Sequence, residues 1–148
     1  MPEGRRPSLE ELVYRVHETL YLRTGGRIGH RLILVPTLLL TTTGRRTGAR
    51  RTRALVYARD TDGYVVVASN GGRDRPPAWY VNLRADPRVE VQVGTSRMHA
   101  GARPVERGDA DYERLWRLVN RNNHGRYDGY QRRTGRPIPL VVLTPVPD

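Results

Sequence analysis

Short runs of apolar and β-branched residues, joined by tight turns, limit the folds open to this chain more than any other feature. Two pairs of such runs are predicted to form hairpins, because the residues between the members of each pair are typical of turns. The runs are residues 51–58 and 64–69 around the turn 59–63, and residues 89–93 and 97–105 around the turn 94–96. Further strands are expected over residues 32–42 and 138–144. This order predicts a small closed or half-closed antiparallel barrel.

Helical patterns surround these strands and make the predicted class α+β. Residues 8–23 carry apolar side chains at helical spacing, and Ser8 with Glu11 forms a capping box, so an N-terminal amphipathic helix is expected there. Two or three further helices are expected, one over residues 77–85 and one after Asp109. No linker or internal repeat interrupts the chain, so residues 1–148 are expected to form a single domain.

Several kinds of catalytic site are excluded by what the sequence lacks. It contains no cysteine, its histidines show no metal-ligand spacing, and it has no GxSxG, P-loop or GxGxxG motif. No metal is therefore expected, and an enzyme of this sequence would take its chemistry from an organic cofactor. The first residues do not resemble a secretory signal and no apolar run is long enough to span a membrane, so a cytoplasmic location is expected.

The chain has a formal net charge of +11 and contains arginine but no lysine. Such a surplus favours anionic partners: nucleic acid, an acidic membrane surface or a polyanionic small molecule. The arginines are spread along the chain, without interleaved aromatic residues for base stacking and without a recognition-helix signature. Nucleic acid is therefore not the expected partner, and a small anionic molecule fits better.

The densest group of arginines lies in residues 41–51, between two predicted strands. Their sequence, TTTGRRTGARR, combines hydroxyl groups, two glycines and four arginines. Glycines let a backbone turn its N–H groups outward, and guanidinium groups bind oxyanions through paired hydrogen bonds. The stretch predicts a binding site for phosphate or carboxylate.

A second polar stretch begins where the predicted strand 64–69 ends. Two glycines follow Ser69 and Asn70, and the helix expected over residues 77–85 then presents Trp79 and Asn82. Close backbone approach, an aromatic wall and a few polar groups are what a flat cofactor needs. The alternatives are that Asn70 begins an ordinary turn and that Trp79 is an ordinary core residue.

Two tyrosines, Tyr127 and Tyr130, lie shortly before the last predicted strand. If this segment is helical, their spacing places them on one face, where they can cover a pocket and donate hydroxyl groups to a substrate. The alternative is that they are surface aromatic residues beside a loop.

Three motifs occur in order: residues 38–48, the strand end 67–72 and the segment 77–87, with residues 133–139 as a further match. Together they resemble the deazaflavin-dependent nitroreductase family, whose members are split β-barrel proteins that bind coenzyme F-420. The resemblance covers roughly residues 30–146. It implies a split antiparallel β-barrel of about six strands, flanked by an N-terminal helix and two or three further helices.

In that family the glycine-basic loop holds the phosphate and tail of the cofactor, while the next strand end and the Trp-containing helix border the deazaflavin. The cofactor-binding residues implied by the resemblance are Arg45, Arg46, Thr47, Arg51, Val67, Ala68, Ser69, Asn70, Ala78, Trp79 and Asn82. The resemblance also places Tyr127 and Tyr130 beside the ring and the substrate, so the expected catalytic residues are Ser69, Tyr127 and Tyr130. Many relatives carry lysine where this chain has Asn70, which removes one cationic contact to the phosphate.

The hypothesis is an F-420-dependent reductase that passes hydride to an electron-poor small molecule such as a quinone, an enone or a nitro compound. The less favoured cofactor is FMN. The alternative function is that of a non-catalytic carrier or sequestering protein for F-420 or FMN. A monomer or a homodimer is expected, with the N-terminal helix as the segment that would contact the cytoplasmic face of a membrane.

Overall fold

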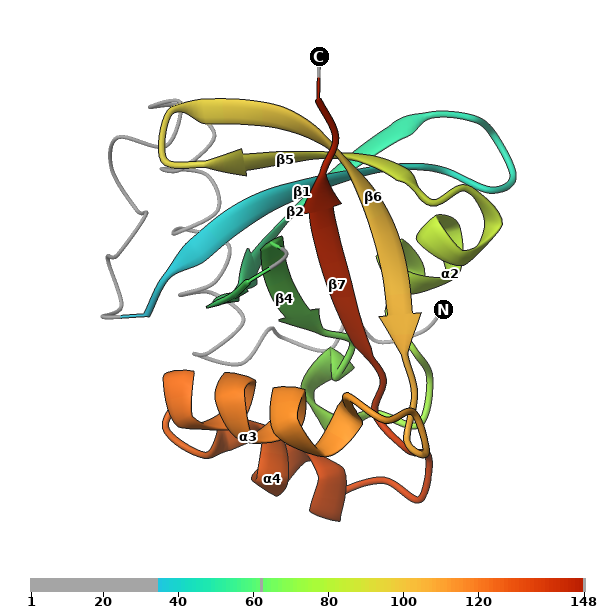
Figure 1. Ribbon diagram of the computed structural model, residues 1–148. Coiled ribbons are helices and arrows are strands. Elements are labelled where there is room, and N and C mark those ends of the chain that lie inside the picture. Colours follow the sequence, from blue (N-terminus) through green and yellow to red (C-terminus); the bar gives the residue numbers. More distant parts are fainter. Residues whose placement is uncertain (1–34, 62, 148) are drawn as a thin grey trace.

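The computed structural model describes residues 35–61 and 63–147 (Figure 1). The helix expected over residues 8–23 lies outside the described residues. The elements in chain order are β1 Thr37–Thr43, β2 Arg50–Val56, β3 Ala58–Asp60, β4 Gly63–Val67, the 3-10 turn η1 Asn70–Gly72, α2 Ala78–Ala85, β5 Arg88–Val93, β6 Ser96–Val105, α3 Tyr112–Asn122, α4 Arg126–Arg132 and β7 Leu140–Pro145. None of the helices in the described part of the chain is long and apolar enough to cross a membrane.

The strands form one seven-stranded sheet in the order β2-β1-β5-β6-β7-β4-β3. Every neighbouring pair is antiparallel, as the two predicted hairpins require. The sequence predicted about six strands, and the additional strand comes from residues 51–58. That run was expected to be one strand, but it is interrupted at Tyr57 and contributes both β2 and β3.

The interruption at Tyr57 explains how the sheet curls. Strand β2 pairs with β1 at one edge of the sheet, while β3, one residue further along the chain, pairs with β4 at the other edge. The two edges must therefore meet at Tyr57. The backbone N–H of Tyr57 donates to the carbonyl of Pro36 (3.1 Å), and its buried ring packs edge-on against Tyr64, with 5.4 Å between the ring centroids.

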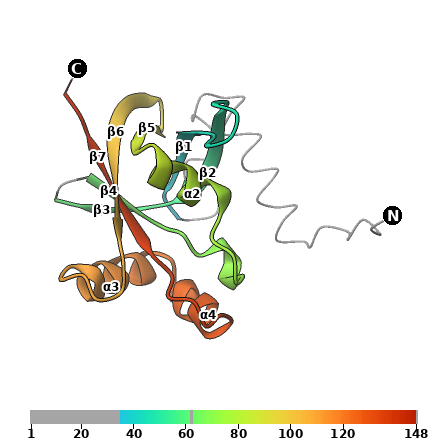
Figure 2. The same cartoon turned by 90° about the vertical axis from the view of Figure 1, so that its right-hand side faces the viewer.

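Side-chain alternation along β4 and β7 creates two separate cores, because successive residues of a strand point to opposite faces. Val66 and Leu143 point to the inner face, where the strands close around Trp79 and Leu83 of α2. On the outer face lie Val65, Val67, Leu140 and Val142, together with Tyr112, Leu115 and Val119 of α3 and Tyr127 of α4. Figure 2 shows α2 on one side of the strands and the α3–α4 pair at the end of the molecule.

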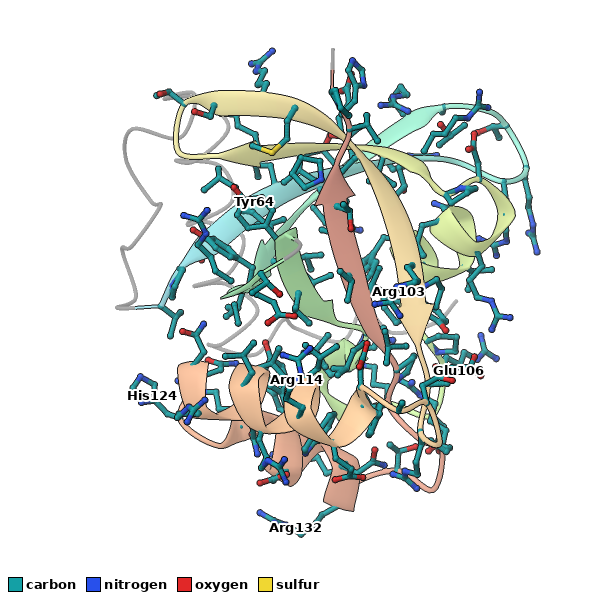
Figure 3. All side chains as sticks on the ribbon, viewed as in Figure 1. Tyr64, Arg103, Glu106, Arg114, His124 and Arg132 are labelled. Atoms are coloured by element: carbon teal, nitrogen blue, oxygen red, sulfur yellow. The ribbon has the colours of Figure 1, made fainter. Side chains whose placement is uncertain are left out.

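Helix α3 is held in place by polar contacts as well as by this core. The Tyr112 hydroxyl donates to the carbonyl of Ile138 (2.6 Å), and Arg114 forms two hydrogen bonds with Asp60 of β3 (2.9 and 3.1 Å). Figure 3 shows Arg114 on the side of α3 that faces the sheet and Arg132 on the far side of α4. The three α-helices within residues 35–147 agree with the predicted number of two or three beyond the N-terminal one.

Candidate functional site

The predicted oxyanion site forms a compact arginine turn (residues 44–51) between β1 and β2. Gly44 N–H donates to the carbonyl of Ala49 (2.7 Å), and Gly48 N–H donates to the carbonyl of Gly44 (2.8 Å). The Thr47 hydroxyl accepts the N–H of Ala49 (3.2 Å). Gly48 has a φ of 72°, a left-handed conformation that favours glycine. The turn thus uses its own backbone groups to close and leaves its arginine side chains on the surface.

Asn82 of α2 connects the arginine turn to the rest of the protein. Its Oδ1 accepts hydrogen bonds from the backbone N–H and from Nη1 of Arg45, both at 3.2 Å. Its Nδ2 donates to the hydroxyl of Thr42, at 3.4 Å, and both Asn82 and Thr42 are buried. The structure therefore places Asn82 at the arginine turn, with both ends of its amide engaged.

Strand register decides which arginines of β2 share a surface with Asn82. Directly opposed residues of an antiparallel pair point to the same face. Arg51 opposes Thr42, the partner of Asn82, and Arg53 opposes Leu40 of the inner core. Arg51 and Arg53 therefore extend from the face that carries α2.

Arg50 points to the opposite face of β2. It donates to the Thr43 hydroxyl (2.9 Å) and forms an ion pair with Glu90 of β5 (3.3 Å). Arg50 therefore lies away from the surface that Arg51 and Asn82 share. It carries the same charge on the other side of the same strand.

The arrangement fits an anionic ligand. Arg45, Arg46, Arg51 and Arg53 are all exposed, and none of them forms an ion pair with a carboxylate of residues 35–61 or 63–147. Guanidinium groups without a carboxylate partner present several N–H donors in a fixed geometry that matches phosphate and carboxylate oxygens. A phosphate group with a carboxylate tail, as in the cofactor implied by the resemblance, has the charge that this surface complements.

The second predicted stretch forms a glycine bend (residues 69–73) after β4. Three successive residues have positive φ: Asn70 at 48°, Gly71 at 66° and Gly72 at 82°. Such angles are uncommon for a residue with a side chain, so Asn70 is held by its surroundings. The bend contains two internal hydrogen bonds, from Gly72 N–H to Ser69 O (2.9 Å) and from Arg73 N–H to Asn70 O (3.2 Å). The Asn70 side chain adds a third, from Nδ2 to the carbonyl of Arg75 (2.9 Å).

Helix α4 packs directly against this bend. A Cβ atom placed on Gly72 would lie 2.6 Å from the carbonyl oxygen of Tyr130, so only glycine fits at that position. Tyr130 is partly exposed and packs edge-on against Tyr127, with 6.2 Å between their ring centroids. The fold therefore brings Ser69 and Tyr130, 61 positions apart in the numbering, to the same part of the molecule.

The other implied residues differ in how far they reach the surface. Tyr127 is 5% exposed and belongs to the outer core, where it packs on Trp116. Ala68 is fully buried and Trp79 is 7% exposed, and both belong to the inner core. Val67 is buried against α3 and α4, whereas Ala78 is exposed at the first position of α2.

Two residues near the predicted site were missed in the sequence. Arg53 was not predicted as a site residue. It lies two residues after Arg51, and side chains two residues apart in a strand point to the same face, so the sequence could have indicated it. Arg136 was missed because its contacts join distant segments. It donates from Nη2 to the carbonyls of Ser69 (2.9 Å) and Ala68 (3.2 Å), and from Nε to the carbonyl of Arg73 (2.9 Å). No pattern within residues 133–139 predicts those partners.

The described residues contain no group of three or more histidine, aspartate or glutamate side chains that could hold a metal ion. Their chemistry-bearing groups instead divide into a cationic end and a hydroxyl-bearing end. The arginine turn and Asn82 form the first. The glycine bend with Ser69 and Tyr130 forms the second, and residues 74–82 connect them.

Known structures share this architecture. An F420-H2 dependent reductase (FDR-A) is 35% identical with a TM-score of 0.65, covering 73% of this chain and 93% of that chain. A domain-swapped dimer is 31% identical with a TM-score of 0.68, covering 92% of this chain and 99% of that chain. A heme storage protein from Vibrio cholerae shares the fold alone, at 19% identity and a TM-score of 0.59 over 76% of this chain and 82% of that chain. These likenesses confirm the predicted split-barrel class.

Sequence comparison identifies the family. Residues 13–145 match the family described as F420H(2)-dependent quinone reductase. A protein of Mycobacterium tuberculosis (strain H37Rv) named F420H(2)-dependent quinone reductase is 55% identical over 131 residues, which are 88% of this chain and 88% of that protein. The match covers the arginine turn, the glycine bend and both tyrosines of α4. The chain therefore belongs to the F420H(2)-dependent quinone reductase family.

Proposed function

We propose that this protein is a reductase that uses reduced coenzyme F-420 to reduce a quinone. The observation that carries the proposal is the arginine turn, in which the exposed Arg45 and Arg51 lie on the surface shared with Asn82. The family match and the printed names of the relatives support the cofactor and the class of acceptor. Enones and nitro compounds are the other acceptors that the same chemistry would reduce.

The cationic end is proposed to bind the phosphate and the carboxylate tail of the cofactor. Arg45, Arg46 and Arg51, with Thr47, supply N–H and O–H donors, and Arg53 extends the same charged face along β2. The buried side chain of Asn82 holds Arg45 in place. Part of the conformational entropy that Arg45 would lose on binding is therefore already lost before the ligand arrives. The lysine that many relatives carry is replaced by Asn70, and Arg73 and Arg75, which follow closely in the chain, are the candidates for the missing cation.

The hydroxyl-bearing end is proposed to border the deazaflavin and the acceptor. Reduced coenzyme F-420 supplies the hydride when it is bound. Ser69 and Tyr130 would hold the acceptor by hydrogen bonds to its oxygen atoms. The small side chain of Ala78 would leave space for the ring beside them. Tyr127 and Trp79 would act from the two cores, where they fix α4 and α2.

Proton transfer is the chemical contribution expected of Tyr130, because the reduced acceptor oxygen must gain a proton. Replacing Tyr130 with phenylalanine should lower kcat about tenfold, which is less than the ~100-fold or more typical of general acid catalysis, because neighbouring water can partly substitute. The dissociation constant of F-420 should stay within a factor of about two. The matched control is Tyr112→Phe, which removes a buried hydroxyl bonded to Ile138 and should lower stability without changing kcat. An unchanged kcat in Tyr130→Phe would show that this hydroxyl takes no part in the reaction.

The decisive experiment is a pair of fluorescence titrations with F-420 and FMN, followed by steady-state assays of reduced F-420 with a water-soluble quinone. Tighter binding of F-420 together with turnover is the expected result. Preference for FMN would contradict the proposed cofactor. Binding of F-420 without turnover on quinone, enone or nitro acceptors would instead identify a carrier.

A further inference from the structure

Arg136 joins the two ends of the glycine bend. Its guanidinium group donates to the carbonyls of Ala68 and Ser69 where the bend begins and to the carbonyl of Arg73 where it ends. One planar group therefore spans the whole turn. Hydrogen bonds from a charged donor are stronger than those between neutral groups, and the fixed fork of arginine adds directional specificity.

The bend needs such an external support. It contains three consecutive positive φ angles, including that of Asn70, and only two internal backbone hydrogen bonds hold it. Burial lowers the pKa of Arg136, so its charge is partly removed from water. A desolvated cation gains most from well-aligned carbonyl dipoles, which the backbone before and after the bend provides.

Arg136 is itself held by α4. The side chain of Gln131 donates from Nε2 to the carbonyl of Arg136 (2.9 Å) and accepts the N–H of Ile138 at Oε1 (2.9 Å). Thr134 donates to Asp74 just beyond the bend (2.7 Å). Because Gln131 follows Tyr130 directly, the helix, the Arg136 guanidinium and the glycine bend form one connected unit.

We infer that Arg136 is a positioning residue that fixes Ser69 and the glycine bend relative to Tyr130. It need not touch the cofactor or the acceptor. Its effect on the reaction rests on the proposed function, because it acts through a bend that we place beside the deazaflavin. Its effect on the bend does not depend on that placement.

The surroundings of Arg136 provide a matched control. A hollow of about 320 Å³ is lined by Arg136 together with Tyr80, Arg84, Glu106 and Arg107. Arg84 pairs with Glu106 (3.3 Å) on the surface, at the place marked by Glu106 in Figure 3, and its guanidinium lies 5.8 Å from the Tyr80 ring centroid. Arg84→Ala removes the same charge from the same hollow, but no hydrogen bond joins its side chain to the glycine bend.

The test compares Arg136→Lys, Arg136→Ala and Arg84→Ala by amide hydrogen exchange, F-420 titration and steady-state kinetics. In Arg136→Lys the amides of Gly72 and Arg73 should exchange at least about tenfold faster, since one ammonium group cannot span three carbonyls. F-420 should bind about tenfold more weakly or worse, the range for losing a charged hydrogen bond. Arg84→Ala should match the unaltered protein in exchange and affinity.

Chemical rescue adds a readout that a general loss of stability would not show. Millimolar guanidinium chloride should partly restore F-420 binding in Arg136→Ala, because the side chain borders an open hollow. Sodium chloride at the same concentration should not. If Arg136→Ala fails to fold, Arg136→Lys carries the test alone.

Unchanged exchange of Gly72 and Arg73 in Arg136→Lys would overturn the inference. Faster exchange with unchanged affinity and kcat would uphold the role of Arg136 in the bend. That second outcome would show that the bend is not part of the cofactor site, and it would contradict the proposed function and not the role of Arg136.

Discussion

The two ends of the candidate site are held in opposite ways. The arginine turn is exposed, closes through its own backbone and is connected to α2 through the side chain of Asn82. The glycine bend is packed against Tyr130 and spanned by Arg136. Surface cations are sufficient to bind a flexible anionic tail, whereas a reacting ring needs surrounding groups that are fixed on several sides.

The largest expected effect is that of adding one methyl group to the glycine bend. Gly72→Ala should destabilise the protein by about 3 kcal/mol, since the left-handed φ is unfavourable for alanine and the new Cβ would meet the carbonyl of Tyr130. Gly48→Ala and Gly71→Ala have equally positive φ but open space around the added atom, and should cost only about 1 kcal/mol each. Urea unfolding measures all three. Equal losses would show that the bend is no more tightly packed than the arginine turn.

The next effect tests the contact between Asn82 and the arginine turn. Asn82→Ala removes the acceptor for two Arg45 donors and the partner of the buried Thr42 hydroxyl, and should lower the free energy of unfolding by about 2 kcal/mol. Asn82→Asp keeps an acceptor for Arg45 but adds negative charge, so it should weaken F-420 binding more than it lowers stability. Chemical denaturation and cofactor titration of both variants separate the two effects. An Asn82→Ala protein of unchanged stability would show that the turn is held elsewhere.

The two faces of β2 offer a third comparison. Arg51→Ala should weaken F-420 binding by about 10-fold to 100-fold, the range for hydrogen bonds to a charged group. Arg50→Ala removes the same charge from the other face, where the side chain pairs with Glu90, and should change affinity by less than about threefold. Titration at two ionic strengths checks both. Equal losses would mean that overall charge, and not the face of the strand, attracts the cofactor.

The smallest effect concerns the α3–β3 contact, which lies in neither end of the site. The hydrogen bonds from Arg114 hold the pKa of Asp60 below its usual value of 3.8. A lowered pKa stabilises the fold above 3.8, and this contribution is lost as the pH falls through the lowered pKa. Asp60→Asn should therefore cost about 0.5–1 kcal/mol at pH 6, and the difference from the unaltered protein should shrink below pH ~4. Urea unfolding at both pH values measures it, and F-420 affinity at pH 6 should not change.

Local patterns predicted most of the fold. The hairpin of residues 89–93 with 97–105 and the helices after residues 77 and 109 were predicted from spacing and turn residues, and the family resemblance is confirmed. The hairpin predicted around residues 59–63 forms only between β3 and β4, because residues 50–56 pair with β1 instead. The break at Tyr57 was not predicted, because residues 54–58 read as one continuous strand and the interruption arises only when the sheet curls.

The site was predictable only in part, for a similar reason. Arginine and glycine patterns indicated the two segments that we propose as the ends of the site, but the side chains that support these segments lie far away in the sequence. Asn82 contacts a residue 37 positions earlier, and Arg136 contacts residues 63 to 68 positions earlier. Such contacts follow from the packing of the barrel, and no local propensity encodes them.

The interruption of the strand at Tyr57 has a consequence for how this family can vary. Because β2 and β3 are consecutive parts of one segment, an inserted or deleted residue before Tyr57 would shift the pairing of β2 with β1 by one position. Arg51 and Arg53 would then exchange faces with Arg50 and Thr52, although no residue of the site had been replaced. We expect the length of the segment between Gly48 and Tyr57 to be as strictly maintained among functional relatives as the arginines themselves.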